Sequence, residues 1–316
     1  MTTADLLKLG PVFLRRDALA AGFNDRALRR AVRDGALERR VHGVYAEPEW
    51  WRKATPEQRH VALAHAVARR LESPYVYSHV TAVLLHGLPV WGVDLGHLHL
   101  THLGPAGGRR QAKVIHHATP RAGDGMVQVD RLPVTGVART VVDFAKTTDV
   151  ERGSVVADAA LAKGLVTRRE LVEQAAAQDH DPSTLHVRLV VRGADGGAQS
   201  AGETRSRFLF ARIGLPAPVL QYEVRDAYGL LLGFVDFAWP EYGVIVEFDG
   251  KVKYTRFLRE GESAIDALMR EKRREDDIRE ATGWTVIRLT WDDLDNPTRT
   301  AERLRRAFQG PRRPAA

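Results

Sequence analysis

Two carboxylates stand in the middle of apolar segments in the C-terminal third of the chain. Asp236 interrupts the segment 234–238 (FVDFA), and Glu247 interrupts the segment 244–248 (VIVEF). An ionised carboxylate inside an apolar strand costs several kcal/mol of desolvation unless a partner compensates for it. The strands expected over 231–239 and 244–249 are joined by a four-residue turn, 240–243, so the two acids can lie side by side across a β-ladder. Asp249 shares the strand face of Glu247, because side chains alternate with a period of two.

Oxygen ligands with neither cysteine nor histidine among them suit a hard cation. The three acids Asp236, Glu247 and Asp249 therefore predict a Mg²⁺ or Mn²⁺ site. Such a cation lowers the pKa of a bound water and stabilises the charge that develops on a phosphodiester. Lys251 and Lys253 follow closely and are the candidates to hold the phosphate. Because the chain has no cysteine, thiolate metal sites, disulfides and thiol catalysis are excluded.

The elements that must position these acids can be predicted from the surrounding pattern. We expect a helix, three meandering strands, a helix, a strand and a closing helix, over residues 200–213, 219–224, 231–239, 244–249, 263–281, 283–290 and 297–308. Glu203, on the first of these helices, has two interpretations. It is either an auxiliary acid of the site or, with Ser200, half of a Ser-x-x-Glu capping box. Asp249 followed by Gly250 also has the alternative of a plain turn.

The segment 235–250 (VDFAWPEYGVIVEFDG) closely resembles the PD-(D/E)XK nuclease superfamily, and within it the domains akin to the very-short-patch-repair (Vsr) mismatch endonuclease. Supporting matches are GET at 202–204, KRRED at 272–276 and GWTVIRLT at 283–290, and the resemblance covers residues 200–308. It implies a restriction-endonuclease-like fold.

The same resemblance implies a role for each acid. Asp236 and Glu247 would be metal ligands, Asp249 a further acid of the site, and Glu203 an auxiliary acid. The chain departs from the pattern twice. The lysine of the superfamily usually stands two residues after the second acid, where this chain has Asp249. Relatives of this kind often carry a histidine four residues beyond that aspartate, where this chain has Lys253.

Arginines at helical spacing mark the N-terminal segment. A predicted helix over 26–34 follows a first helix over 14–21 and precedes an alternating segment, 37–45, that turns at Gly43. This order of helix, turn, helix and wing predicts a winged helix-turn-helix that binds double-stranded DNA. The alternative is a solvated charged face. The candidate DNA-binding residues are Arg26, Arg29, Arg30, Arg33, Arg39 and Arg40.

Residues 37–46, which end in GVYA, resemble the winged N-terminal domain of AbiEi-type antitoxins. Residues 78–88 (SHVTAVLLHGL) and 132–143 (LPVTGVARTVVD) resemble the body of the same proteins, so the resemblance covers most of residues 11–175. It implies a DNA-binding autorepressor of a bacterial toxin–antitoxin system, with a toxin protein as a partner.

Histidines are concentrated in the middle of the chain, where nine of the twelve lie between His60 and His117. His97 and His99 would share one strand face and His102 follows, which raises the question of a metal site. No cysteine and no acid stands at a familiar ligand spacing. We therefore interpret these imidazoles as polar loop or core residues.

Length and composition bound the architecture. The chain has 316 residues, 44% of them hydrophobic, and a net charge of +7. No apolar run is long enough for a transmembrane helix, and the N-terminus lacks the apolar stretch of a signal peptide, so a cytoplasmic location is expected. We expect an α/β (α+β) protein with a winged helix at 1–55, an α/β middle region at 56–195 and a nuclease-like domain with a mixed central sheet at 196–316.

Taken together, the sequence predicts a DNA-binding protein with a Mg²⁺-dependent endonuclease domain. The alternative is a non-catalytic DNA-binding antitoxin or regulator whose nuclease fold is degenerate. A homodimer is left open.

Overall fold

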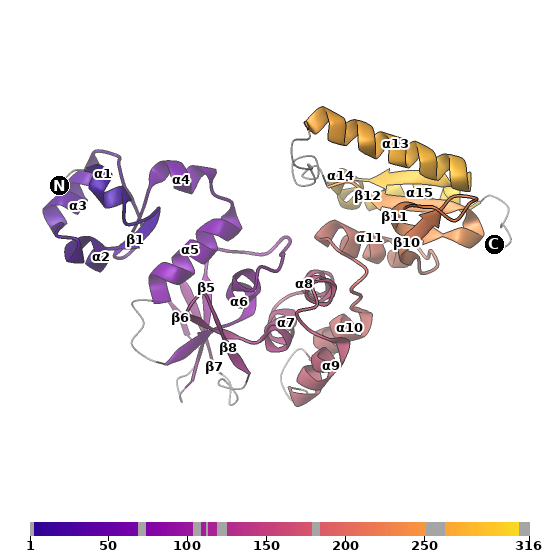
Figure 1. The fold of residues 1–316 in the computed structure, drawn as a ribbon. Helices are drawn as coiled ribbons and strands as arrows, with labels where there is room; N and C mark the ends of the chain where they lie inside the picture. Colours follow the sequence, from indigo (N-terminus) through magenta and orange to yellow (C-terminus); the bar gives the residue numbers. More distant parts are fainter. Residues whose placement is uncertain are drawn as a thin grey trace. The chain divides into compact units, whose positions relative to one another are not determined.

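The computed structural model describes residues 3–68, 74–103, 109–111, 113–118, 125–178, 184–250 and 263–309. The described chain is a mixed α/β protein with three sheets (Figure 1). It divides into two compact units, residues 1–156 with 166–191 and residues 157–165 with 192–316. Helix α8 (Val150–Ala162) contributes residues to both units. In the described parts of the chain, no helix is both long and apolar enough to cross a membrane.

The first unit begins with three short helices and a small antiparallel sheet in the order β1-β3-β2. Asn24 starts the third helix, because its side chain accepts a hydrogen bond from the backbone N–H of Ala27. The apolar residues of these elements form one core, which includes Phe13, Phe23 and Leu28. The elements are α1 (Thr3–Leu7), β1 (Val12–Leu14), α2 (Arg15–Ala20), α3 (Asp25–Arg33), β2 (Glu38–Val41) and β3 (Val44–Ala46).

The rest of the first unit is built on a six-stranded mixed sheet, in the order β6-β7-β5-β4-β9-β8. Its strands are β4 (Tyr75–Tyr77), β5 (Leu98–His102), β6 (Arg109–Gln111), β7 (Val114–Ala118), β8 (Met126–Val129) and β9 (Leu132–Thr135). The other helices of the first unit are α4 (Pro48–Lys53), α5 (Pro56–Ala68), α6 (His79–Leu85), α7 (Val137–Lys146), α9 (Arg168–Ala177) and α10 (Thr184–Gly193). Tyr77, Leu98 and Leu100 lie in the core of this sheet, with Ala64 of α5.

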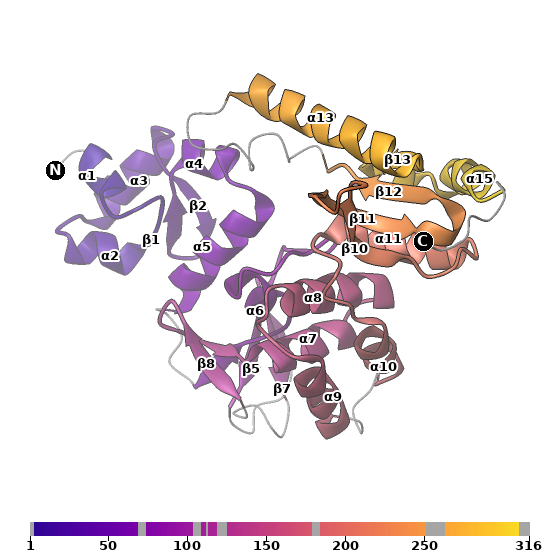
Figure 2. The same cartoon turned by 45° about the vertical axis from the view of Figure 1, so that its right-hand side comes forward.

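The second unit is built on a four-stranded sheet in the order β10-β11-β12-β13. The first three strands are antiparallel, whereas β13 runs parallel to β12. One core joins the sheet to Phe210 of α11 and Leu304 of α15, and a second joins it to Ile278 of α13. Figure 2 shows the long helix α13 beside the sheet. The elements are α11 (Ala201–Arg212), β10 (Val219–Arg225), β11 (Leu231–Trp239), η1 (Pro240–Tyr242), β12 (Val244–Phe248), α13 (Ala264–Thr282), β13 (Thr285–Leu289), α14 (Trp291–Asp295) and α15 (Pro297–Ala307).

Candidate functional site

The arginines of α3 form one solvent-exposed face. With about 100° between successive residues, the four side chains fall within about 100° of arc, opposite the buried Leu28 and Ala31. Arg30 and Arg33 make only long contacts to Asp34, at 3.4 and 3.3 Å, and each side chain is 75% exposed. The four exposed arginines are Arg26, Arg29, Arg30 and Arg33.

The two arginines of β2 differ from each other. Arg39 is exposed, with its Nη2 atom 2.6 Å from Nδ1 of His42. Arg40 pairs with Glu38 and stacks on the ring of Trp51, with its guanidinium carbon 4.3 Å from the ring centroid. Burial, and then repulsion from Arg59, lower the pKa of Arg40. The contacts of Arg40 are therefore those of a packing residue.

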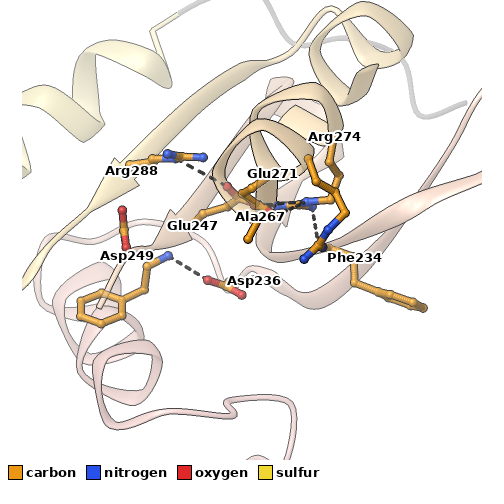
Figure 3. A pocket seen from close by; sticks show the side chains of 10 residues that line it. Phe234, Asp236, Glu247, Asp249, Ala267, Glu271, Arg274 and Arg288 are labelled. Atoms are coloured by element: carbon orange, nitrogen blue, oxygen red, sulfur yellow. Dashed lines mark hydrogen bonds and ion pairs between the residues drawn. The ribbon is translucent and has the colours of Figure 1, made fainter. Parts of the chain in front are cut away.

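An acidic pocket lies in the second unit (Figure 3). It has a volume of about 310 Å³ and is lined by Asp236, Glu247 and Asp249 together with arginines of α13 and β13. Strands β11 and β12 bring the first two acids together, since their last paired residues are Phe237 and Val246.

Asp236 lies where the ladder between β11 and β12 ends. Its Oδ2 atom accepts a hydrogen bond of 2.8 Å from the backbone N–H of Phe248, so the side chain takes the place of a strand partner. Asp249 is the first residue after β12, and its own N–H donates to the carbonyl of Leu289 on β13 at 2.7 Å. The carboxylate of Asp236 and the backbone of Asp249 are thereby fixed beside the pocket.

Glu247 is paired with an arginine of the KRRED segment, a pairing that the sequence did not predict. Nη2 of Arg274, on α13, lies 2.8 Å from Oε1 of Glu247, and Nε of Arg288 lies 3.9 Å from Oε2. Arg274 also bonds Glu271 at 2.6 Å and the carbonyl of Phe234 at 3.1 Å. Burial lowers the pKa of Arg274. Its hydrogen bonds to Glu271 and its attraction to Glu247 raise the pKa by more than burial lowers it, so the pKa lies above the ordinary guanidinium value.

The acidic pocket fits a divalent cation only in part. Its carboxylate oxygens are the donors that Mg²⁺ prefers. Within the described residues, however, Asp236, Glu247 and Asp249 do not bring their ligand atoms within 4.8 Å of one another. Glu247 is moreover neutralised by Arg274. The donor chemistry fits a hard cation, but the arrangement does not.

The remaining predicted site residues lie away from this pocket lining or outside the described chain. Glu203 is buried and holds the start of α11, since its Oε1 accepts from Ser200 at 2.7 Å and its Oε2 from the N–H of Gln199 at 2.8 Å. Ser200 caps α11, because its hydroxyl accepts from the N–H of Glu203 at 3.2 Å, whereas the carboxylate of Glu203 bonds the residue before the cap rather than the N–H of Ser200. Lys251 and Lys253 lie outside the described residues.

Comparison with known proteins finds two relatives and one solved structure that are similar over most of the chain. The chain is 28% identical over 278 residues to two proteins of Mycobacterium tuberculosis, "Uncharacterized protein MT2308" (strain CDC 1551 / Oshkosh) and "Uncharacterized protein Rv2248" (strain ATCC 25618 / H37Rv). Each match covers 87% of this chain and 93% of the relative. The crystal structure of the Rv2827c protein of M. tuberculosis is similar with a TM-score of 0.40 and 16% identity, over 72% of this chain and 89% of that one.

A family model gives the most specific finding. The family described as "Transcriptional regulator, AbiEi antitoxin" matches residues 1–48, the segment that contains α3 and its arginine face. This agrees with the antitoxin resemblance drawn from residues 37–46. Residues 1–48 of this chain are therefore similar to the AbiEi antitoxin family.

Proposed function

We propose that the protein is a DNA-binding transcriptional regulator of the AbiEi antitoxin type. The observation that carries this proposal is the exposed arginine face of α3, which lies inside the segment matched by that family. The elements of residues 3–46 follow the order α, β, α, α, β, β. This is the order of a winged helix, with α3 as the recognition helix and β2 and β3 as the wing.

Electrostatics supports the same assignment. Residues 1–60 carry 12 basic and 8 acidic side chains, the densest positive excess in the chain. Guanidinium groups on one helix face can bind backbone phosphates and the acceptor atoms of guanine in the major groove. Arg30 and Arg33 are highly exposed and contact Asp34 at 3.4 and 3.3 Å, so their binding to DNA would break weak surface contacts rather than buried ones.

The test is DNA binding by the full-length protein, measured by fluorescence anisotropy at fixed salt with a labelled duplex from upstream of its own gene. We expect Arg29→Ala/Arg33→Ala to weaken binding by at least tenfold. Arg169→Ala removes an equally exposed arginine from α9 and should leave affinity within about twofold. Equal affinity of all three proteins would refute the assignment of α3.

A metal-dependent endonuclease is the second candidate, favoured by one observation: the three predicted acids, together with Glu271, line one pocket where the pairing of β11 with β12 ends. We place it second because Glu247 is already paired with Arg274. The check is incubation of the protein with supercoiled plasmid and Mg²⁺ or Mn²⁺, beside Asp236→Ala and Glu247→Ala. Our first proposal predicts no nicking by any of them. Nicking by the wild type alone would establish the nuclease.

The same proposal includes a toxin protein as partner, because the family description names an antitoxin. A cytoplasmic location and a homodimer remain predictions from the sequence. Size-exclusion chromatography with light scattering would test the homodimer directly.

A further inference from the structure

Three imidazoles meet in the first unit. His79 is the first residue of α6, His99 lies on β5 and His117 on the adjacent strand β7; Figure 2 labels these three elements. One ligand nitrogen of each histidine lies within 4.8 Å of the other two. Across the described residues, no other three side chains of the ligand types His, Cys, Asp and Glu meet this distance.

The two strand histidines are already close to a ligand spacing. Nε2 of His117 lies 3.0 Å from Nδ1 of His99. Two nitrogens bound to one tetrahedral zinc ion at 2.0–2.1 Å would be about 3.3 Å apart. Because two imidazole nitrogens at this distance must share one proton, a divalent ion can replace that proton with only a small movement of the rings.

The third histidine, His79, is buried and its ring stacks on that of His117, with centroids 3.6 Å apart and planes inclined by 16°. Its backbone has φ of +51°, a left-handed conformation that residues with a side chain rarely adopt. Its Nδ1 lies 2.9 Å from the hydroxyl of Ser78, which also accepts a hydrogen bond from Thr101. Histidine ligands are typically oriented by such an oxygen on the nitrogen away from the metal.

The charges around the cluster are compatible with a bound cation. Burial is the largest of the causes that lower the pKa of all three histidines, to about 3 for His99 and about 4 for His117. The cations that face His79 come from α7 and already have partners. Arg139 pairs with Asp143 at 2.8 Å, and Lys146 donates to Gln178.

We propose that His79, His99 and His117 bind one divalent transition-metal ion of the zinc class through three imidazole nitrogens. Nitrogen ligands select ions such as Zn²⁺, Co²⁺ and Ni²⁺ over Mg²⁺ and Ca²⁺. Three protein ligands leave a fourth tetrahedral position for water or another ligand. The ion ties together α6, β5 and β7, which are separate in the sequence.

The experiment titrates the chelator-treated, full-length protein with Co²⁺ and then Zn²⁺, followed by calorimetry and by the visible absorption of tetrahedral Co²⁺. We expect one ion per chain with a micromolar or lower Kd. His99→Gln and His117→Gln should each weaken binding at least tenfold. His186→Gln is the matched control, because it changes an exposed histidine on α10 that bonds only the carbonyl of Thr148 at 3.1 Å.

Two results would overturn the proposal: a wild-type protein that binds no ion at one equivalent, or His99→Gln binding as tightly as the wild type. Circular dichroism establishes whether each variant folds. If a variant does not fold, proton NMR of the Co²⁺-loaded wild type decides the matter. Three exchangeable, paramagnetically shifted imidazole resonances are expected. The absence of all such resonances would contradict the site.

Discussion

The guanidinium group of Arg274 on α13 lies 2.8 Å from the carboxylate of Glu247 on β12. This ion pair joins the long helix to the sheet at the wall of the acidic pocket. Arg288, paired with Glu247 in the parallel register of β12 and β13, lies farther from it, at 3.9 Å. Arg274 is therefore the main partner that compensates for the burial of Glu247.

Replacing Arg274 with methionine should lower the free energy of unfolding by about 2 kcal/mol, because Glu247 loses its closest charged partner in a partly buried site. Urea unfolding monitored by tryptophan fluorescence measures the change. Arg273→Met on the same helix is the matched control, because Arg273 is exposed. Equal stability of the two variants would show that the ion pair contributes nothing.

Gly202 allows α11 to approach the sheet. A Cβ atom at this position would lie 1.9 Å from Cε1 of Phe248, whose ring is buried. Gly202→Ala should therefore lower the free energy of unfolding by about 3 kcal/mol, since the core must shift to accept the methyl group. Gly193→Ala, where no atom lies within 4 Å, should change stability by less than about 1 kcal/mol. Thermal unfolding of both variants tests this difference.

Asp158 of α8 predicts a pH dependence of stability. Burial raises its pKa to about 6, although Arg207, the N–H of Asp195 and the hydroxyl of Thr204 act in the opposite direction. The folded state thus binds the proton more tightly than the unfolded chain, where the pKa is about 3.9. The stability gained is complete below about pH 4 and is lost as the pH rises through 6.

Asp158→Asn removes this titration. Between pH 4 and pH 7, the wild type should lose about 2 to 3 kcal/mol more unfolding free energy than the variant. Urea unfolding at several pH values gives the comparison. Parallel curves, or a wild type that gains stability over this range, would contradict the assigned pKa.

Much of the fold could be predicted from local pattern. The strand over 231–239 has the predicted bounds, and the helix after Ser200 begins where its capping box placed it. These elements carry their own signals in turn residues, caps and apolar runs. The mixed α/β class was also predicted and is confirmed by the structure.

Elements without such signals were missed. Strand β1 has only three residues, Val12–Leu14, and exists because β3 pairs with it. Helix α14 (Trp291–Asp295) has five residues, too few to show a helical period, although Thr290 and Asp293 form a capping box at its start.

Contacts between distant residues were the least predictable part of the sites. Glu247 and Arg274 are 27 residues apart, and nothing in the KRRED segment at 272–276 identifies Arg274 as the partner of that acid. His117 joins His99 only through the pairing of β5 with β7, whereas sequence proximity had pointed to His97 and His102. Sequence spacing describes one element at a time, but tertiary pairing decides which elements meet.

The central claim is that the arginine face of α3 binds DNA. Its most direct test is the slope of log Kd against log salt concentration, measured by anisotropy for the wild type, Arg29→Ala/Arg33→Ala and Arg169→Ala. Removing one arginine that binds a DNA phosphate lowers this slope by about 0.9. We predict a slope lower by about 2 in the double variant and unchanged in Arg169→Ala. The same slope for all three proteins would contradict a DNA interface on α3.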